Sequence, residues 1–158
     1  MKWCRFEKAY NNRGLARFAQ TDYQGAIKDY DQAIDHSDRW AWAFLNRGLA
    51  RYAIGEYRDA TKDYDRAIDI DGDYIEAYYQ RSLARVARKK YEDAIADCDR
   101  VINRDPNYAV AYEVKGNSFL ALKKIPEAKQ ASAQAINIYL QKQDHANLQR
   151  VQQLMSGI

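Results

Sequence analysis

The chain has 158 residues, of which 47% are apolar and 30% are charged, with only 7 glycines and 2 prolines. This composition excludes a disordered or collagen-like chain, and 25 basic against 22 acidic residues leave no charge excess that would indicate a nucleic-acid partner. No apolar run approaches the roughly 20 residues of a membrane-spanning helix, and the N-terminus lacks the apolar stretch of a secretory signal. We therefore expect a cytoplasmic, helix-rich protein with no membrane span.

A repeat of 34 residues organises most of the sequence. The copies cover about residues 7–40, 41–74, 75–108 and 109–142. The first two copies agree at 17 of their 34 positions and the second and third at 15, whereas the fourth has diverged. A period of this length indicates stacked supersecondary units that bury a continuous core between neighbours. We expect one domain over residues 1–158.

Each copy predicts two helices separated by a short polar break. In the first copy, apolar residues recur at helical spacing over residues 8–20 and again over 23–35. Residues 144–156 have the same three-and-four spacing, which predicts a final amphipathic helix that caps the last pair. Small residues recur at two places in the copies, where paired helices can approach closely: Gly14, Gly48, Ser82 and Gly116, and Ala26, Ala60, Ala94 and Ala128.

Period, small residues and aromatic residues together resemble the tetratricopeptide repeat (TPR) family, in a style similar to bacterial and particularly cyanobacterial members. The resemblance covers residues 7–142. It implies an all-α, right-handed superhelical solenoid of four helix-turn-helix repeats plus a capping helix. The first helix of each copy would line a concave face that binds ligands.

No catalytic, phosphate-binding or metal-binding signature is present, so we expect no enzyme, no cofactor and no metal. Cys4 and Cys98 share no short spacing, and two free thiols are the simplest interpretation. Acidic residues are plentiful, but they recur with the repeat, as Asp29, Asp63 and Asp97 show. A feature copied in every repeat is typical of a scaffold, because an active site is built once.

A basic series recurs at a position where the resemblance implies leucine. It comprises Arg13, Arg47, Arg81 and Lys115. One interpretation is a cationic ladder for an acidic ligand. The favoured interpretation is structural, because a buried guanidinium needs a carboxylate partner and the Asp series supplies one in matching number.

The concave face implied by the resemblance carries apolar residues flanked by carboxamides, as a peptide-binding groove would. Asn12, Asn46 and Gln80 recur at the repeat spacing and could bond a peptide backbone, or else neighbouring helices or water. The predicted peptide-binding residues are Asn11, Asn12, Leu15, Phe18, Leu45, Asn46, Leu49, Tyr52, Tyr79, Gln80, Leu83, Val86 and Asn117. Some of them could equally belong to the core between helices.

The sequence argues against one ligand of the family, the acidic C-terminal tail of chaperones. The residues at the clamp positions are Asn11, Leu15, Glu76 and Gln80. The basic residues of the clamp are missing, and Glu76 would repel a carboxylate.

We therefore expect a protein-interaction scaffold or adaptor that binds an extended or helical segment of a protein partner. The alternative is a self-association module, in which Trp3 and Phe6 of an uncapped first repeat dock on a second copy. Single-stranded RNA binding is a weaker third interpretation, because related repeats use a more basic face.

Overall fold

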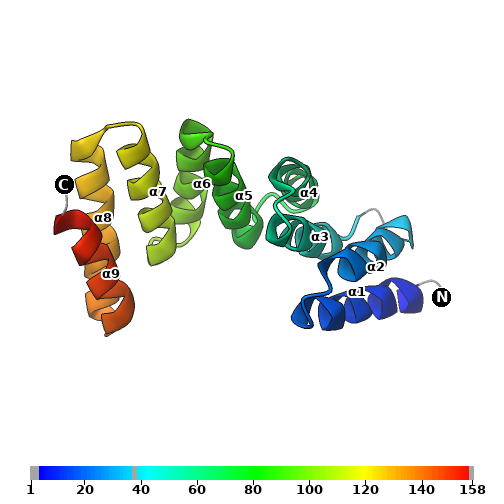
Figure 1. Ribbon diagram of the computed structural model, residues 1–158. Helices are drawn as coiled ribbons and strands as arrows, with labels where there is room; N and C mark the ends of the chain where they lie inside the picture. The colour runs from blue at the N-terminus through cyan, green and yellow to red at the C-terminus, as the bar shows by residue number, and fades with distance from the viewer. Residues whose placement is uncertain (1–3, 37–38, 157–158) are drawn as a thin grey trace. The chain divides into compact units, whose positions relative to one another are not determined.

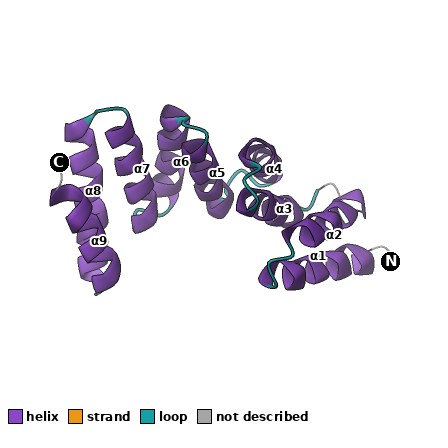
Figure 2. Ribbon diagram, viewed as in Figure 1, coloured by secondary structure: helices purple, strands orange, loops and turns teal. Residues whose placement is uncertain are grey.

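The computed structural model describes residues 4–36 and 39–156, with side chains from Glu7 onward (Figure 1). Over these ranges the chain forms helices and no strand, joined by short loops (Figure 2). The helices are α1 (Cys4–Ala19), α2 (Tyr23–His36), α3 (Ala41–Ala53), α4 (Tyr57–Ile70), α5 (Ile75–Ala87), α6 (Tyr91–Arg104), α7 (Ala109–Ala121), α8 (Ile125–Gln141) and α9 (His145–Ser156). The predicted all-α fold of helix pairs is confirmed. None of the described helices is long and apolar enough to cross a bilayer.

The chain divides within α5 into two parts, one ending at Ala84 and one starting at Arg85. In the first part α1 packs on α2, α2 on α3, and α3 on α4. In the second part α6 packs on α7, α7 on α8, and α8 on α9. In each part, these consecutive helices pack on one another, as the repeat predicts. The single domain over residues 1–158 stays a prediction.

The turns inside the helix pairs share one backbone conformation. Thr21, Gly55, Lys89 and Lys123 stand at the same position of the four copies, and all have positive φ, between 58° and 83°. Only glycine adopts this region without a steric cost, so three of the four turns are mildly strained. In the first turn Asp22 caps α2, because its carboxylate accepts a 2.9 Å hydrogen bond from the backbone N–H of Gly25.

A tyrosine ring lies on a glycine in each of the first two helix pairs. A Cβ atom on Gly14 would lie 2.6 Å from Cε1 of Tyr30, and one on Gly48 would lie 2.5 Å from Cε1 of Tyr64. Both rings are buried. The small-residue series of the sequence is therefore explained, because the ring of the second helix occupies the space that a side chain on the first helix would need.

The last helix covers the preceding pair, as predicted. Leu148 and Val151 of α9 are buried against Ala135, Ile138 and Tyr139 of α8. The carboxylate of Asp144 accepts a 3.2 Å hydrogen bond from the backbone N–H of Asn147 and so caps α9. At the other end, α1 begins at Cys4, but Trp3 and the side chain of Phe6 lie outside the described residues. Self-association through these two residues stays a prediction.

The buried tyrosines predict loss of stability in alkali. Burial, reinforced by nearby acidic groups, raises the pKa of Tyr30 and Tyr74 to about 12 and also raises the pKa of Tyr64. Above about pH 10 the unfolded chain releases phenolic protons that the folded chain retains, so the free energy of unfolding falls as pH rises from about 10 to 12. We expect tyrosinate absorbance and loss of helical circular dichroism to rise together.

The control for this prediction is Tyr64→Phe, which leaves the ring but removes a buried hydroxyl that has no hydrogen-bond partner. We expect its alkaline transition at higher pH than that of the wild type, because one group with a raised pKa is gone. A wild-type chain whose tyrosines all titrate near pH 10 before any helix is lost would contradict the prediction.

Candidate functional site: the ionic contacts and the α1–α3 face

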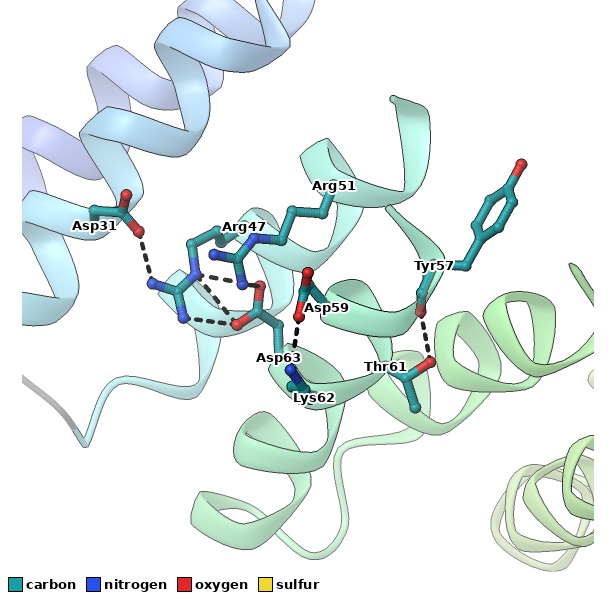
Figure 3. A network of polar contacts seen from close by, with 8 residues as sticks. All are labelled: Asp31, Arg47, Arg51, Tyr57, Asp59, Thr61, Lys62 and Asp63. Carbon is teal, nitrogen blue, oxygen red and sulfur yellow. Dashed lines mark hydrogen bonds and ion pairs between the residues drawn. The ribbon is translucent and has the colours of Figure 1, made fainter. Parts of the chain in front are cut away.

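Arg47, on α3, forms ion pairs with the second helix of its own copy, α4, and with the second helix of the preceding copy, α2 (Figure 3). Its Nη2 lies 2.6 Å from Oδ1 of Asp63 on α4, the second helix of its own copy, and its Nη1 lies 2.7 Å from Oδ1 of Asp31 on α2, the second helix of the preceding copy. Arg51 adds a 2.7 Å contact to the other oxygen of Asp63. One carboxylate thus receives two guanidinium groups, and one guanidinium bridges two copies.

The same spacing recurs in both parts of the chain. A basic residue contacts an aspartate 16 positions later in its own copy, 16 positions earlier in the preceding copy, or 12 positions later. The further contacts are Arg13–Asp29 (2.6 Å), Arg17–Asp29 (3.0 Å), Arg81–Asp65 (2.6 Å), Arg85–Asp97 (2.6 Å) and Lys115–Asp99 (2.6 Å). The structural interpretation of the basic series is confirmed, because its members hold carboxylates of their own chain.

The aspartates at the centre of these contacts are costly to bury. Asp29, Asp63 and Asp97 are all about 2% exposed. Burial raises the pKa of the Asp63 carboxyl above its ordinary value, although Arg47 and Arg51 both oppose that rise. A buried ion pair of this kind need not add net stability, but removal of one partner leaves the other charge buried without compensation.

The fourth copy has different residues at all three positions of this arrangement. Lys115 stands at the position of Arg47, Phe119 at the position of Arg51, and Ala131 at the position of Asp63. Lys115 keeps its bond to Asp99 of the preceding copy. The buried carboxylate and its second arginine disappear together, so that neither charge is left without a partner.

The predicted carboxamide series does not present a uniform edge to a ligand. Asn11 and Asn46 are 3% and 8% exposed, and Nδ2 of Asn46 donates a 2.9 Å hydrogen bond to Oδ1 of Asn11. This bond joins α1 to α3. Asn12 is exposed, whereas Gln80 is half-buried and donates to the carboxylate of Glu76. Asn46 therefore connects the first helices of two copies, and one N–H of its amide is already used in that bond.

Beside this bond, the same faces of α1 and α3 carry apolar side chains with different exposure. Two consecutive helical hairpins make α1 and α3 run in the same direction, so residues one turn beyond Asn11 and Asn46 are neighbours. Leu15 is 41% exposed, and Leu49 is half-buried. Trp42, one turn before Asn46 on α3, is 59% exposed. We call Leu15, Trp42 and Leu49 the α1–α3 face.

The other predicted peptide-binding residues lie at various depths. Leu45 is buried in the core, and Phe18, Leu49 and Tyr52 are half-buried and pack against core clusters. Tyr79 and Leu83 are half-buried on α5. Val86 and Asn117 belong to the second part of the chain, where Val86 is half-buried and Asn117 exposed. Their binding role stays a prediction.

Trp42 is not among the peptide-binding residues predicted from the sequence. The equivalent residues of the other copies are Lys8, Glu76 and Val110, so the repeat does not mark this position as aromatic. The available signal was its helical spacing, because Trp42 lies three, four and seven residues before Leu45, Asn46 and Leu49, on one face of α3. A large exposed indole on that face is the clearest apolar contact point of the described surface.

Comparison with known proteins identifies the architecture. Among solved structures, MamA matches 87% of this chain and 81% of its own, with a TM-score of 0.85 and 21% identity. The first TPR of Spaghetti (RPAP3), bound to the HSP90 peptide SRMEEVD, covers 82% of this chain and 94% of its own, with a TM-score of 0.66 and 26% identity. The second TPR domain of human RPAP3, in complex with the HSP70 peptide SGPTIEEVD, covers 73% and 94%, with a TM-score of 0.68 and 29% identity.

In sequence, none of the curated proteins matches the chain. Two sequence profiles, both described as tetratricopeptide repeat, match residues 7–40 and residues 45–109. Together they cover more than half of the chain and agree with its helix pairs. This chain belongs to the tetratricopeptide repeat family.

Proposed function

We propose that the protein is an interaction scaffold that binds a segment of a protein partner on the α1–α3 face. The observation that carries this proposal is the pair of large apolar side chains, Trp42 and Leu15, that this face exposes to solvent. Exposed apolar residues that share one face are typical of interfaces, and tryptophan is the residue type most enriched among energetically dominant contacts. The peptide complexes of the RPAP3 domains support such a role for this fold.

The chemistry of the face favours an apolar segment over an acidic tail. Leu15 occupies a position where the family clamp carries a polar group, and Glu76 occupies a position where it carries a cation. The Glu76 carboxylate is bonded to Gln80, 2.6 Å from its amide nitrogen. We therefore propose a partner whose aliphatic or aromatic side chains pack on Trp42 and Leu15, and we expect the acidic peptide SRMEEVD not to bind.

The test compares variants of the exposed residues. A partner is captured from the native cell with the wild type, purified, and titrated against Trp42→Ala and Leu15→Asp. We expect each variant to weaken binding at least about tenfold, as truncation of a dominant contact does, and to keep the wild-type melting temperature because both side chains face solvent. The matched control is Leu140→Asp, which changes another exposed leucine, 53% exposed, on α8.

Two results would remove the proposal. If both variants bind the purified partner as tightly as the wild type while Leu140→Asp weakens it, the binding surface lies in the second part of the chain. If SRMEEVD binds with saturation and competes with the partner, the apolar character proposed for the ligand is wrong.

A further inference from the structure

The last helix pair has a cavity beside the position at which the first two pairs hold a tyrosine ring. The position of Tyr30 and Tyr64 is occupied by Ser132 in α8. Beside it lies a cavity of about 200 Å³ between α7, α8 and α9. Its lining residues are Glu113, Asn117, Ser132, Arg150, Val151 and Leu154.

Two residues next to this position are apolar in the second copy and polar in the fourth. In the second copy, Leu45 is buried in the same core cluster as Tyr64, and Leu49 packs against that cluster. The equivalents of these leucines in the fourth copy are Glu113 and Asn117. A ring and two aliphatic side chains have thus been replaced by a hydroxyl, a carboxylate and a carboxamide around an open space. Loss of core volume alone would not require polar replacements.

Ser132 is only 2% exposed, and it lines the cavity. The hydroxyls of Ser82 and Ser118, two other buried serines, each donate to a backbone carbonyl of their own helix. A serine hydroxyl can both donate and accept a hydrogen bond. Because Ser132 lines the cavity, a group inside the cavity could bond its hydroxyl.

The charges of the lining are already balanced. One oxygen of Glu113 accepts from the hydroxyl of Tyr139, and Nη2 of Arg150 lies 2.8 Å from either oxygen of Glu113. The carboxylate keeps a free acceptor site, since it offers about four. A charged ligand would disturb a neutral pair, whereas a neutral ligand with a hydroxyl could bond Ser132, Asn117 or Glu113 without adding charge.

We infer that this cavity binds a neutral phenol-type ring, either a tyrosine side chain of a partner or a free phenolic molecule. The volume suits a substituted ring, because a dry protein cavity of roughly 150 Å³ holds benzene. Tyr30 and Tyr64 show that a ring fits over the glycine at the equivalent position of this fold. Val151 and Leu154 supply apolar contacts for its faces, and the polar residues select the hydroxyl. This inference does not depend on the function proposed for the α1–α3 face.

The first experiment titrates p-cresol into the isotope-labelled full chain and follows amide chemical shifts. We expect saturable shifts confined to residues 113–117, 132 and 148–154. Toluene, which has the same ring and methyl group without the hydroxyl, is expected to bind about fivefold more weakly, as loss of one neutral hydrogen bond predicts. A capped Gly-Tyr-Gly peptide distinguishes the two sources, because only a side-chain site open to a partner would accept it.

The second experiment fills the cavity with the chain's own ring. Ser132→Tyr is expected to abolish the p-cresol shifts, whereas Ala133→Tyr, which places the same ring on the exposed neighbouring position, is expected to leave them unchanged. If Ser132→Tyr does not fold, Ser132→Ala serves instead and is expected to reduce the preference for p-cresol over toluene. The inference is overturned if the wild type shows no saturable shift, if toluene binds as tightly as p-cresol, or if a folded Ser132→Tyr variant still binds p-cresol.

Discussion

Replacement of Asp63 by alanine is expected to destabilise the protein by about 3–5 kcal/mol, the range measured when one partner of a buried ion pair is removed. Asp63 receives Arg47 at 2.6 Å and Arg51 at 2.7 Å, and its side chain is 3% exposed. Without the carboxylate, Arg47 retains only Asp31, and Arg51 loses its 2.7 Å contact. Urea denaturation followed by circular dichroism gives the change in the free energy of unfolding.

Two variants give this prediction its controls. Asp59→Ala removes a carboxylate one turn earlier on α4, where the pair with Lys62 is exposed (Figure 3), and is expected to change stability by less than about 1 kcal/mol. The triple variant Arg47→Lys, Arg51→Phe, Asp63→Ala installs the residues of the fourth copy and is expected to recover most of the loss. Equal effects of Asp59→Ala and Asp63→Ala would show that the buried pair is not structural.

Gly48→Ser is expected to destabilise the protein by about 1–3 kcal/mol, the usual range for overpacking in a close-packed core. Its Cβ would lie 2.5 Å from Cε1 of Tyr64, whose ring is fully buried and cannot move aside. The third copy shows the compatible combination, Ser82 with Cys98 in place of the ring. In a Tyr64→Cys background, the same Gly48→Ser change is therefore expected to have little further effect.

The matched control for the glycine is Gly72→Ser. A Cβ at this exposed loop position would meet no atom within 4 Å, so the melting temperature is expected to stay unchanged. Thermal melts of the single, double and control variants form a double-mutant cycle that isolates the contact. Equal losses from Gly48→Ser with and without Tyr64 would contradict the packing explanation.

The fold was predictable because the same sequence signals recur in each copy of the repeat. The small residues, the aromatic residues and the polar breaks each recur at the same positions, so a misread residue in one copy is corrected by the others. The start of α2 at Tyr23 and the capping helix α9 over His145–Ser156 agree with the sequence pattern almost to the residue. The pairing of the Arg and Asp series was also predictable, since a buried charge must find a partner.

Exposure was harder to predict, because it depends on contacts between copies that the repeat does not specify. Asn46 looks like one member of an amide series in the sequence, yet its neighbour Asn11 turns it into a buried link between α1 and α3. Trp42 has no equivalent in the other copies and is the most exposed large apolar side chain described. Features that belong to one copy alone are those in which the structure adds most to the sequence.

The double contact of Arg47 makes the stability of one helix pair conditional on its neighbour. Its guanidinium holds Asp63 within its own copy and Asp31 in the copy before. Melting of the first pair would therefore deprive the second of a carboxylate, so that the two behave as coupled sites of a one-dimensional lattice and not as independent units. Lys115 keeps the equivalent contact with the preceding copy through Asp99, whereas Ala131 stands where the second copy has Asp63. The fourth pair is therefore tied to its neighbour through a charge that has no second carboxylate within its own copy.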